Sequence, residues 1–289
     1  MDEINRRINS FFKTDVGYLH ILKLVKSKLP FLVINENNLE NIKIEKMDYQ
    51  YFLQSGFVGE YVASKNLIKL FFGHQVINIS ESEIIETFTH EFIHLLTSEY
   101  DHNGMLLQGF NMRSVDNVDS YFIGLNEGIT QMIAEDVLGI KKSDAYPFET
   151  NIARKLAVII GKEKLIELYS KHDIDGLITE IAKIDLNFDM REFIIKVYCL
   201  HDFISGTNYS DALGLGTEVE QLLIDLYQKS GKDMDEDFSK LIIDKKMADE
   251  MAALVPNSVK SGSTYLYYDT YNEKDMALVS KEKGGRTNG

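Results

Sequence analysis

The sequence predicts an α+β fold in which a strand-containing first half is followed by a mostly helical second half. Short runs rich in β-branched and aromatic residues cluster before residue 75. Apolar residues recur at helical spacing from residue 80, and the pattern beyond residue 140 is mostly helical. The 289 residues suffice for two packed lobes, which we place at 1–140 and 141–280, with 281–289 as a disordered tail.

The first half is expected to open with helix and to continue as a small twisted sheet. Two short amphipathic helices are predicted within residues 2–29, because Pro30 cannot continue a helix. Three strands are predicted from their β-branched and aromatic content, at residues 31–34, 57–64 and 67–72. Ser64, Lys65 and Asn66 lie between the last two strands and fit a hairpin turn.

A long helix is predicted to begin after Ser80. Ser80 with Glu83 three residues later fits a capping box, in which each side chain bonds the backbone N–H of the other residue. An apolar stripe follows at helical spacing, formed by Ile85, Phe88, Phe92, Leu95 and Leu96. Glu86, His90 and His94 lie four residues apart, so they stack along a different face of the same helix.

The remaining elements follow from turn residues and helical spacing. "DHNG" at 101–104 is expected to be a turn, and 105–112 a short strand or an extended loop. A second helix is predicted over 126–138, ending at Gly139, a residue favoured after a helix C-terminus. Later helices are predicted at 148–160, 162–171, 173–184, 188–205, 217–230 and 236–254, and a β-hairpin at 263–280.

The composition indicates a soluble globular protein with an acidic net charge of −14. This charge argues against nucleic acid or an anionic membrane as a partner, because both need a basic face. Cys199 is the only cysteine, so an intramolecular disulfide and a Cys-based zinc finger are excluded. The N-terminal residues lack the apolar core of a secretory signal, and no run of about 18 apolar residues occurs. We therefore expect a cytoplasmic protein, with export without a cleavable signal as the alternative.

The stretch "THEFIHLLT" at 89–97 contains H-E-x-x-H, formed by His90, Glu91 and His94. Two histidines one helical turn apart can reach one metal ion, and the glutamate between them can take a proton from a water bound to that ion. His90 and His94 are therefore candidate zinc ligands, and Glu91 is a candidate general base. The alternative is a solvated helix face that carries two histidines.

A third candidate ligand stands at the start of the second predicted helix. From there Glu127 can cross to the first helix and complete a His-His-Glu set. Gln131 and Glu135 lie one and two turns further on the same face, where they could hydrogen-bond a ligating histidine. Alternatively, Glu127 is a carboxylate that the helix dipole favours near a helix start.

"THEFIHLL" followed by "LNEGITQ" resembles the gluzincin branch of the zincin metallopeptidases, which includes thermolysin and aminopeptidase N. "GEYVASKNLIKLFF" also resembles the zincin hairpin whose edge strand binds the substrate backbone. The resemblance covers about residues 56–140. It implies a zincin-like fold and a peptidase acting on a peptide or protein, with one zinc ion per chain. His90, His94 and Glu127 would bind the zinc, and Glu91 would be the general base.

The sequence departs from that pattern at three points. Gln131 stands where thermolysin has an acidic residue, and a neutral amide raises the basicity of a ligating histidine less. The interval between His94 and Glu127 is longer than in thermolysin or aminopeptidase N, which suggests an inserted loop at 111–122. The aminopeptidase stretch G-x-M-E-N does not precede the zinc helix, so an endopeptidase is expected.

Zincins usually add a tyrosine or histidine that stabilises the oxyanion. Tyr121 lies shortly before Glu127, as a tyrosine does in lethal-factor-like gluzincins. His201 and Tyr198 lie on a later helix, in the region from which thermolysin draws its histidine. For each of the three, the alternative is a half-buried side chain whose polar tip is satisfied.

The sequence therefore predicts a zinc metallopeptidase with its zinc between an α+β lobe and a helical lobe. A catalytically inactive zincin-fold protein that binds or regulates a partner is the main alternative. A protease with one cellular protein as its only substrate, and a chance H-E-x-x-H in an unrelated protein, are two further alternatives.

Overall fold

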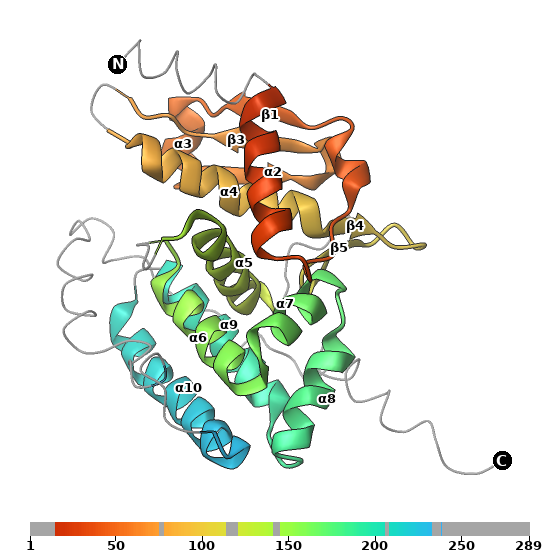
Figure 1. Ribbon diagram of the computed structural model, residues 1–289. Helices are drawn as coiled ribbons and strands as arrows, with labels where there is room; N and C mark the ends of the chain where they lie inside the picture. The colour runs from red at the N-terminus through yellow and green to blue at the C-terminus, as the bar shows by residue number, and fades with distance from the viewer. Residues whose placement is uncertain are drawn as a thin grey trace.

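The computed structural model describes residues 15–74, 78–113, 121–140, 145–205, 208–232 and 238. Over these residues the protein is a mixed α and β structure that is mostly helical, with two small three-stranded sheets (Figure 1). Several predicted features lie outside the described residues: the chain before residue 15, the helix at 236–254 apart from Phe238, the hairpin at 263–280 and the tail.

The first sheet contains β1 (Lys43–Lys46), β3 (Leu67–Leu70) and β2 (Gly59–Val62), in that spatial order. β1 runs parallel to β3, and β2 runs antiparallel to β3 with Gly59 opposite Leu70. The predicted hairpin is present, because β2 and β3 are joined by the short helix η2 (Ala63–Lys65) and by Asn66, which has a φ of 47°. β2 is therefore an edge strand of this sheet.

The strand predicted at 31–34 is wrong. After α2 (Asp15–Lys28) the chain runs as a connector whose backbone bonds helix ends instead of a strand. Val33 N–H donates to Ser170 Oγ at 3.0 Å, and Asn35 N–H donates to the Leu96 carbonyl at 2.8 Å. Leu32 is buried, so the packing of a connector explains this apolar run.

The structure also contains elements that the sequence does not predict. Three of the four residues of β1 are charged, which hides this strand from a search for β-branched runs. The short helices η1 (Glu36–Leu39) and α3 (Tyr49–Ser55) lie on either side of β1 in the chain. Both begin after a polar residue whose side chain accepts a hydrogen bond from a backbone N–H of the helix.

Two long helices form the centre of the molecule. α4 (Glu81–Thr97) packs against β2 and β3, and α5 (Ile123–Leu138) packs against the other side of α4 (Figure 1). The predicted capping box is present at the start of α4, between Ser80 and Glu83. α5 begins a few residues before the predicted start and is buried on most of its surface.

A second sheet follows α4 as an antiparallel meander of β4 (Ser98–Tyr100), β5 (Leu106–Gln108) and β6 (Asn111–Arg113). The turn predicted at 101–104 joins β4 to β5. The segment 105–112 therefore contains two short strands, with Gly109 at a φ of 55° between them.

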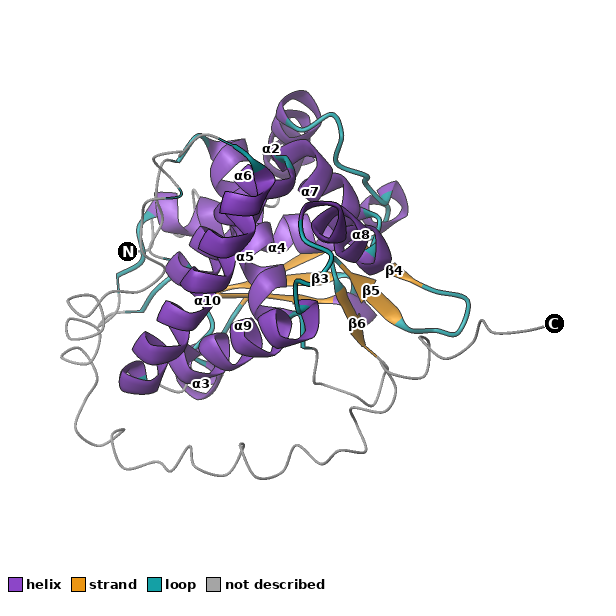
Figure 2. Ribbon diagram, turned by 90° about the horizontal axis from the view of Figure 1, so that it is seen from below, coloured by secondary structure: helices purple, strands orange, loops and turns teal. Residues whose placement is uncertain are grey.

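Between residues 145 and 232, the described part of the second half is helical, as the sequence predicts. Its elements are α6 (Pro147–Ile160), α7 (Lys162–Ser170), α8 (Ile174–Ile184), α9 (Met190–Ser205) and α10 (Tyr209–Ser230). α10 begins at Tyr209 instead of residue 217, because the helix continues through Gly214 and Gly216. α6, α9 and α10 lie on the side of α5 that faces away from the first sheet (Figures 1 and 2).

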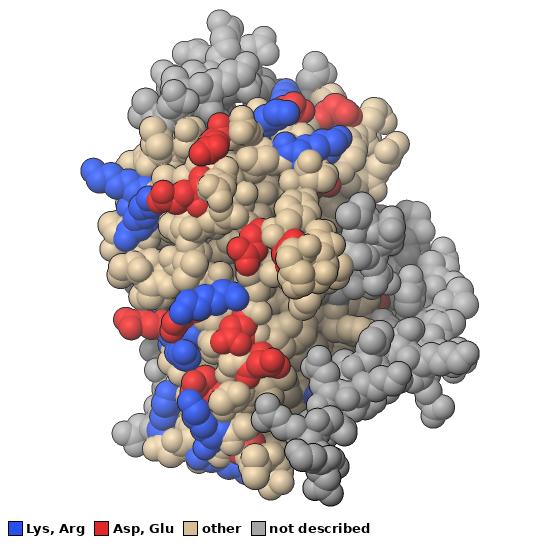
Figure 3. Space-filling view, turned by 90° about the vertical axis from the view of Figure 1, so that its right-hand side faces the viewer, with Lys and Arg blue, Asp and Glu red and all other residues tan. Residues whose placement is uncertain are grey.

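One hydrophobic core joins both halves, with buried side chains from Ile21 of α2 to Phe238. On the face drawn in Figure 3, the acidic and basic side chains of the described residues are interspersed. Within the described chain, no helix has both the length and the apolar character needed to cross a membrane.

Candidate metal site

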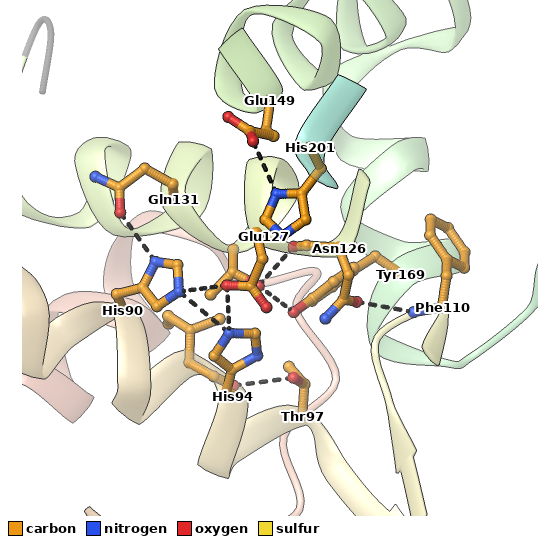
Figure 4. Close-up of polar contacts among 12 residues, drawn as sticks. His90, His94, Thr97, Phe110, Asn126, Glu127, Gln131, Glu149, Tyr169 and His201 are labelled. Atoms are coloured by element: carbon orange, nitrogen blue, oxygen red, sulfur yellow. Dashed lines mark hydrogen bonds and ion pairs between the residues drawn. The ribbon is translucent and has the colours of Figure 1, made fainter. Parts of the chain in front are cut away.

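α4 presents the two histidines of H-E-x-x-H to the side where α5 packs (Figure 4). His90 and His94 are each only 4% exposed, and their rings meet edge to face with centroids 4.8 Å apart. Four residues of the apolar stripe on the same helix are fully buried, namely Phe88, Phe92, Leu95 and Leu96, and Ile85 is half-buried. The alternative of a solvated helix face with two surface histidines is therefore wrong.

Glu127, near the start of α5, points between the two histidines. Its Oε2 lies 2.9 Å from His90 Nε2 and 3.3 Å from His94 Nε2, and the two Nε2 atoms are 3.1 Å apart. Ligands about 2.0–2.1 Å from a tetrahedral zinc ion lie about 3.3 Å from one another. The distances among the three residues are close to this spacing, so the group could hold one metal ion.

The opposite charges of His90 and Glu127 shift the pKa of each one in favour of its charged form. Burial lowers the pKa of His90, but the hydrogen bond to Glu127 and the charge of Glu127, together with smaller effects of Glu91 and Gln131, outweigh it, so the pKa is raised above the ordinary value. Burial raises the pKa of Glu127, but the charges and hydrogen bonds of His94 and His90 hold it well below its usual range. Glu127 is therefore ionised and available to a cation.

The remaining ring nitrogen of His90 is also engaged. His90 Nδ1 lies 2.9 Å from Gln131 Oε1, the contact predicted from the position of Gln131 one turn after Glu127 (Figure 4). Gln131 Nε2 in turn donates to Glu86 Oε1 at 2.7 Å. Glu135, the other residue predicted to support a histidine, forms an ion pair with Arg154 at 2.5 Å.

Glu91 lies between α4 and the edge strand β2. A Cβ atom on Gly59 would come within 3.0 Å of the Glu91 side chain, and the backbone N–H of Tyr61 hydrogen-bonds the carboxylate. Burial raises the pKa of Glu91, while the nearby histidines partly oppose this shift. The strand thus brings peptide backbone directly to the candidate base.

His201 reaches the same region from α9. Its Nδ1 lies 2.8 Å from Oε1 of Glu149, which is 2% exposed, and its ring lies beside Glu127 in Figure 4. Burial lowers the pKa of His201, but the hydrogen bond to Glu149 and the charges of Glu149, Glu127 and Asp202 together outweigh it, so the pKa is raised. His201, predicted from sequence as an oxyanion donor, is therefore held near the candidate metal ligands, and its raised pKa favours the ring with two N–H groups.

Tyr146 is a site residue that the sequence does not single out. Its ring stacks on His90 with centroids 5.2 Å apart and on His201 at 6.3 Å. It directly precedes α6 and has a φ of 48°, a left-handed conformation that is unfavourable for a tyrosine. Burial and the charges of Glu127, Glu91 and Glu149 raise its pKa well above the ordinary value, so it keeps its hydroxyl proton.

The other two predicted oxyanion donors, Tyr121 and Tyr198, contact each other. The rings of Tyr121 and Tyr198 lie edge to face with centroids 5.8 Å apart, and Tyr121 is 41% exposed. Most of the predicted inserted loop at 111–122 lies outside the described residues, so the loop stays a prediction.

The glycines and the asparagine of "GLNEG" at 124–128 allow α6, α9 and the second sheet to approach α5 closely around Glu127. A Cβ on Gly124 would lie 2.9 Å from Cβ of His201, and one on Gly128 would lie 2.1 Å from the Glu149 carbonyl oxygen. The two glycines thus let α9 and α6 approach α5 on either side of the glutamate. Between them, Asn126 Oδ1 accepts the backbone N–H of Phe110 at 3.1 Å and ties the second sheet to α5 (Figure 4).

No family model matches this sequence, and no curated protein and no solved structure gives a match.

Proposed function

We propose that the protein is a zinc-dependent metallopeptidase of the gluzincin type, acting as an endopeptidase. The observation that carries the proposal is the convergence of His90, His94 and Glu127, with Glu91 beside them on α4. A chance H-E-x-x-H gives no reason for a carboxylate from another helix to meet both imidazoles. A zincin-like fold, with the site between an α+β lobe and a helical lobe, is part of the same proposal.

His90, His94 and Glu127 would hold the zinc ion. When bound there, zinc supplies Lewis-acid chemistry that lowers the pKa of water and polarises a carbonyl group. Glu91 accepts the proton of the attacking water and passes it to the leaving amine.

His201 is proposed to donate a hydrogen bond to the oxyanion that develops on the substrate carbonyl. Glu149 accepts from Nδ1 at 2.8 Å and thereby orients the ring, which leaves Nε2 as the donor. Tyr146 stacks between His201 and His90 and limits the movement of both rings.

The outer edge of β2, which pairs with no other strand among the described residues, is the proposed binding site for an extended peptide. The Phe71 N–H donates to the Val58 carbonyl at 2.8 Å, and hydrogen-bonded pairs alternate along an antiparallel ladder. Gly59 and Tyr61 therefore turn their backbone groups away from β3, toward the side where Glu91 lies. A substrate that adds to this edge as a further strand brings its backbone to Glu91.

Zinc content is the first test of the proposal. Wild-type protein purified without added metal should contain about one zinc ion per chain, and Glu127→Ala should lose most of it. Glu91→Gln should keep the zinc and lose peptide hydrolysis by about 10²–10⁴-fold, because the base is removed and the ligands are not. Elemental analysis and cleavage of a mixed peptide pool measure the two effects.

Other outcomes separate the alternatives. Zinc in the wild type without hydrolysis of any peptide favours the inactive zincin-fold binding protein. A wild type that takes up no zinc, even when zinc is supplied, contradicts the metal site. Substantial turnover by Glu91→Gln would leave the site in place and refute the role of Glu91.

A further inference from the structure

Two successive hydrogen bonds lead from His90 back to α4. His90 Nδ1 lies 2.9 Å from Gln131 Oε1, and Gln131 Nε2 donates to Glu86 Oε1 at 2.7 Å. Glu86 lies one helical turn before His90, and Gln131 lies one turn after Glu127. Gln131 is 1% exposed, so water has little access to its amide group.

The direction of these bonds is set at Glu86. An ionised carboxylate only accepts hydrogen bonds, so Glu86 requires the NH₂ group of Gln131 to face it. The carbonyl oxygen of Gln131 must then face His90, where it can only accept. When a metal ion takes the place of the proton on Nε2, the atom that lies 2.9 Å from Glu127, the proton of the neutral His90 ring therefore sits on Nδ1 and faces this acceptor.

We propose that Glu86 is a positioning residue that fixes the amide orientation of Gln131 and, through it, the His90 tautomer that binds metal. A glutamine alone cannot fix this tautomer, because turning its amide plane by half a revolution exchanges donor and acceptor. The turned amide would donate to Nδ1 and move the imidazole proton to Nε2, where it blocks the metal. The Glu86–Gln131 pair thus supplies what a single carboxylate supplies to many metal-binding histidines.

This role rests on the proposed metal site and adds a residue that H-E-x-x-H does not include. It also gives a reason for the neutral amide at position 131. With Glu86 already on α4 at hydrogen-bond distance, a second carboxylate at 131 would face a like charge at 2.7 Å. A glutamine avoids that repulsion and still presents an acceptor to the histidine.

The test removes the carboxylate at position 86, or transfers it to position 131, by exchanging glutamate and glutamine, which have nearly the same volume. In Glu86→Gln, the new amide can accept from Gln131 or donate to it, so the bias on Gln131 is removed. In the double variant Glu86→Gln/Gln131→Glu, the carboxylate contacts His90 directly, and the net charge equals that of the wild type. Glu81→Gln, on the exposed first turn of α4, is the matched control for loss of one charge from this helix.

Two quantities are measured on each protein. Zinc affinity is obtained by competition with a chromophoric chelator. In the zinc-loaded proteins, NMR then follows the exchange of the His90 Nδ1 proton with solvent. We expect Glu86→Gln to bind zinc about tenfold more weakly and to exchange this proton faster. The double variant should recover both properties, and Glu81→Gln should match the wild type.

The recovery also controls for folding, because the double variant contains the same change at position 86. Unchanged affinity and exchange in Glu86→Gln would overturn the positioning role, as would a double variant that stays as weak as the single one. These results presuppose a wild type that binds zinc. A wild type without zinc affinity refutes the proposed function itself and this role with it.

Discussion

At the scale of single residues, the proposed metal ligands form an ion pair before any metal arrives. The pKa of His90 is raised mainly because Glu127, whose own pKa is held low, lies 2.9 Å away. A metal ion binds the neutral imidazole, so it must displace a proton that Glu127 helps to retain. Metal binding and protonation therefore compete at His90.

Zinc affinity should consequently fall as pH is lowered, and the fall should begin above the ordinary histidine pKa of about 6.5. A raised pKa means that His90 keeps its proton to higher pH, and below that pKa each pH unit costs about tenfold in affinity. Glu127 does not compete in this range because its lowered pKa leaves it ionised. Chelator competition from about pH 8 to about pH 5 measures the curve, and an affinity that stays constant down to pH values below the ordinary histidine pKa would contradict it.

Residue spacing predicts the part of the site that lies on two helices. His90 and His94 share a face because they are four residues apart, and the same spacing puts Gln131 one turn after Glu127. Tyr146 could not be predicted, since no motif surrounds it and only the packing of α6 against α5 brings it to His90. Spacing also places Glu86 on the same face of α4 as the histidines. Its proposed role, however, depends on the side-chain amide of Gln131 on α5, which spacing along α4 cannot predict.

At the scale of elements, two glycines of α5 control how closely its neighbours approach. Gly128 meets the backbone of Glu149 at the start of α6, and Gly124 meets the side chain of His201 on α9. The proposed oxyanion donor and its carboxylate partner therefore lie this close to α5 only because α5 has no Cβ at these two positions.

Gly128→Ala should destabilise the protein by about 1–3 kcal/mol, since the new methyl group would overlap a backbone atom that cannot turn aside. The overlap is with the Glu149 carbonyl oxygen, 2.1 Å from the ideal Cβ. Gly214→Ala on α10 is the control: nothing lies within 4 Å of its Cβ position, and alanine there should stabilise the helix by about 0.5–1 kcal/mol. Urea unfolding compares the two, and equal stability of both variants would contradict the proposed close approach.

The elements themselves were predictable where periodicity and caps agree. Ser80 and Glu83 predicted the start of α4, and the β2–β3 hairpin followed from two apolar runs with a polar turn between them. β1 was missed because its charged residues resemble a loop, although parallel pairing with β3 stabilises it. The apolar run at 31–34 was mistaken for a strand because burial in a connector produces the same composition.

At the scale of the whole molecule, a buried charge joins the site-forming helices to the end of the described chain. Lys155 of α6 is fully buried, and its Nζ donates to Glu220 Oε1 of α10 at 2.8 Å and to the Phe238 carbonyl at 2.6 Å. The ring of Phe238 lies under the same ammonium at 4.6 Å and stacks on Tyr227 at 3.9 Å. α6 also carries Glu149, so this cluster and the candidate site share one helix.

Lys155→Met should cost about 3–5 kcal/mol of the free energy of unfolding, because it leaves the carboxylate of Glu220 buried without its counter-charge. Adding Glu220→Leu should recover most of that loss, since a buried ion pair and an apolar pair of similar volume are close in energy. The part that is not recovered measures the bond to the Phe238 carbonyl and the contact with its ring. Urea unfolding of both variants tests this, and a Lys155→Met protein as stable as the wild type would show that the cluster does not hold α10 and Phe238 to the core.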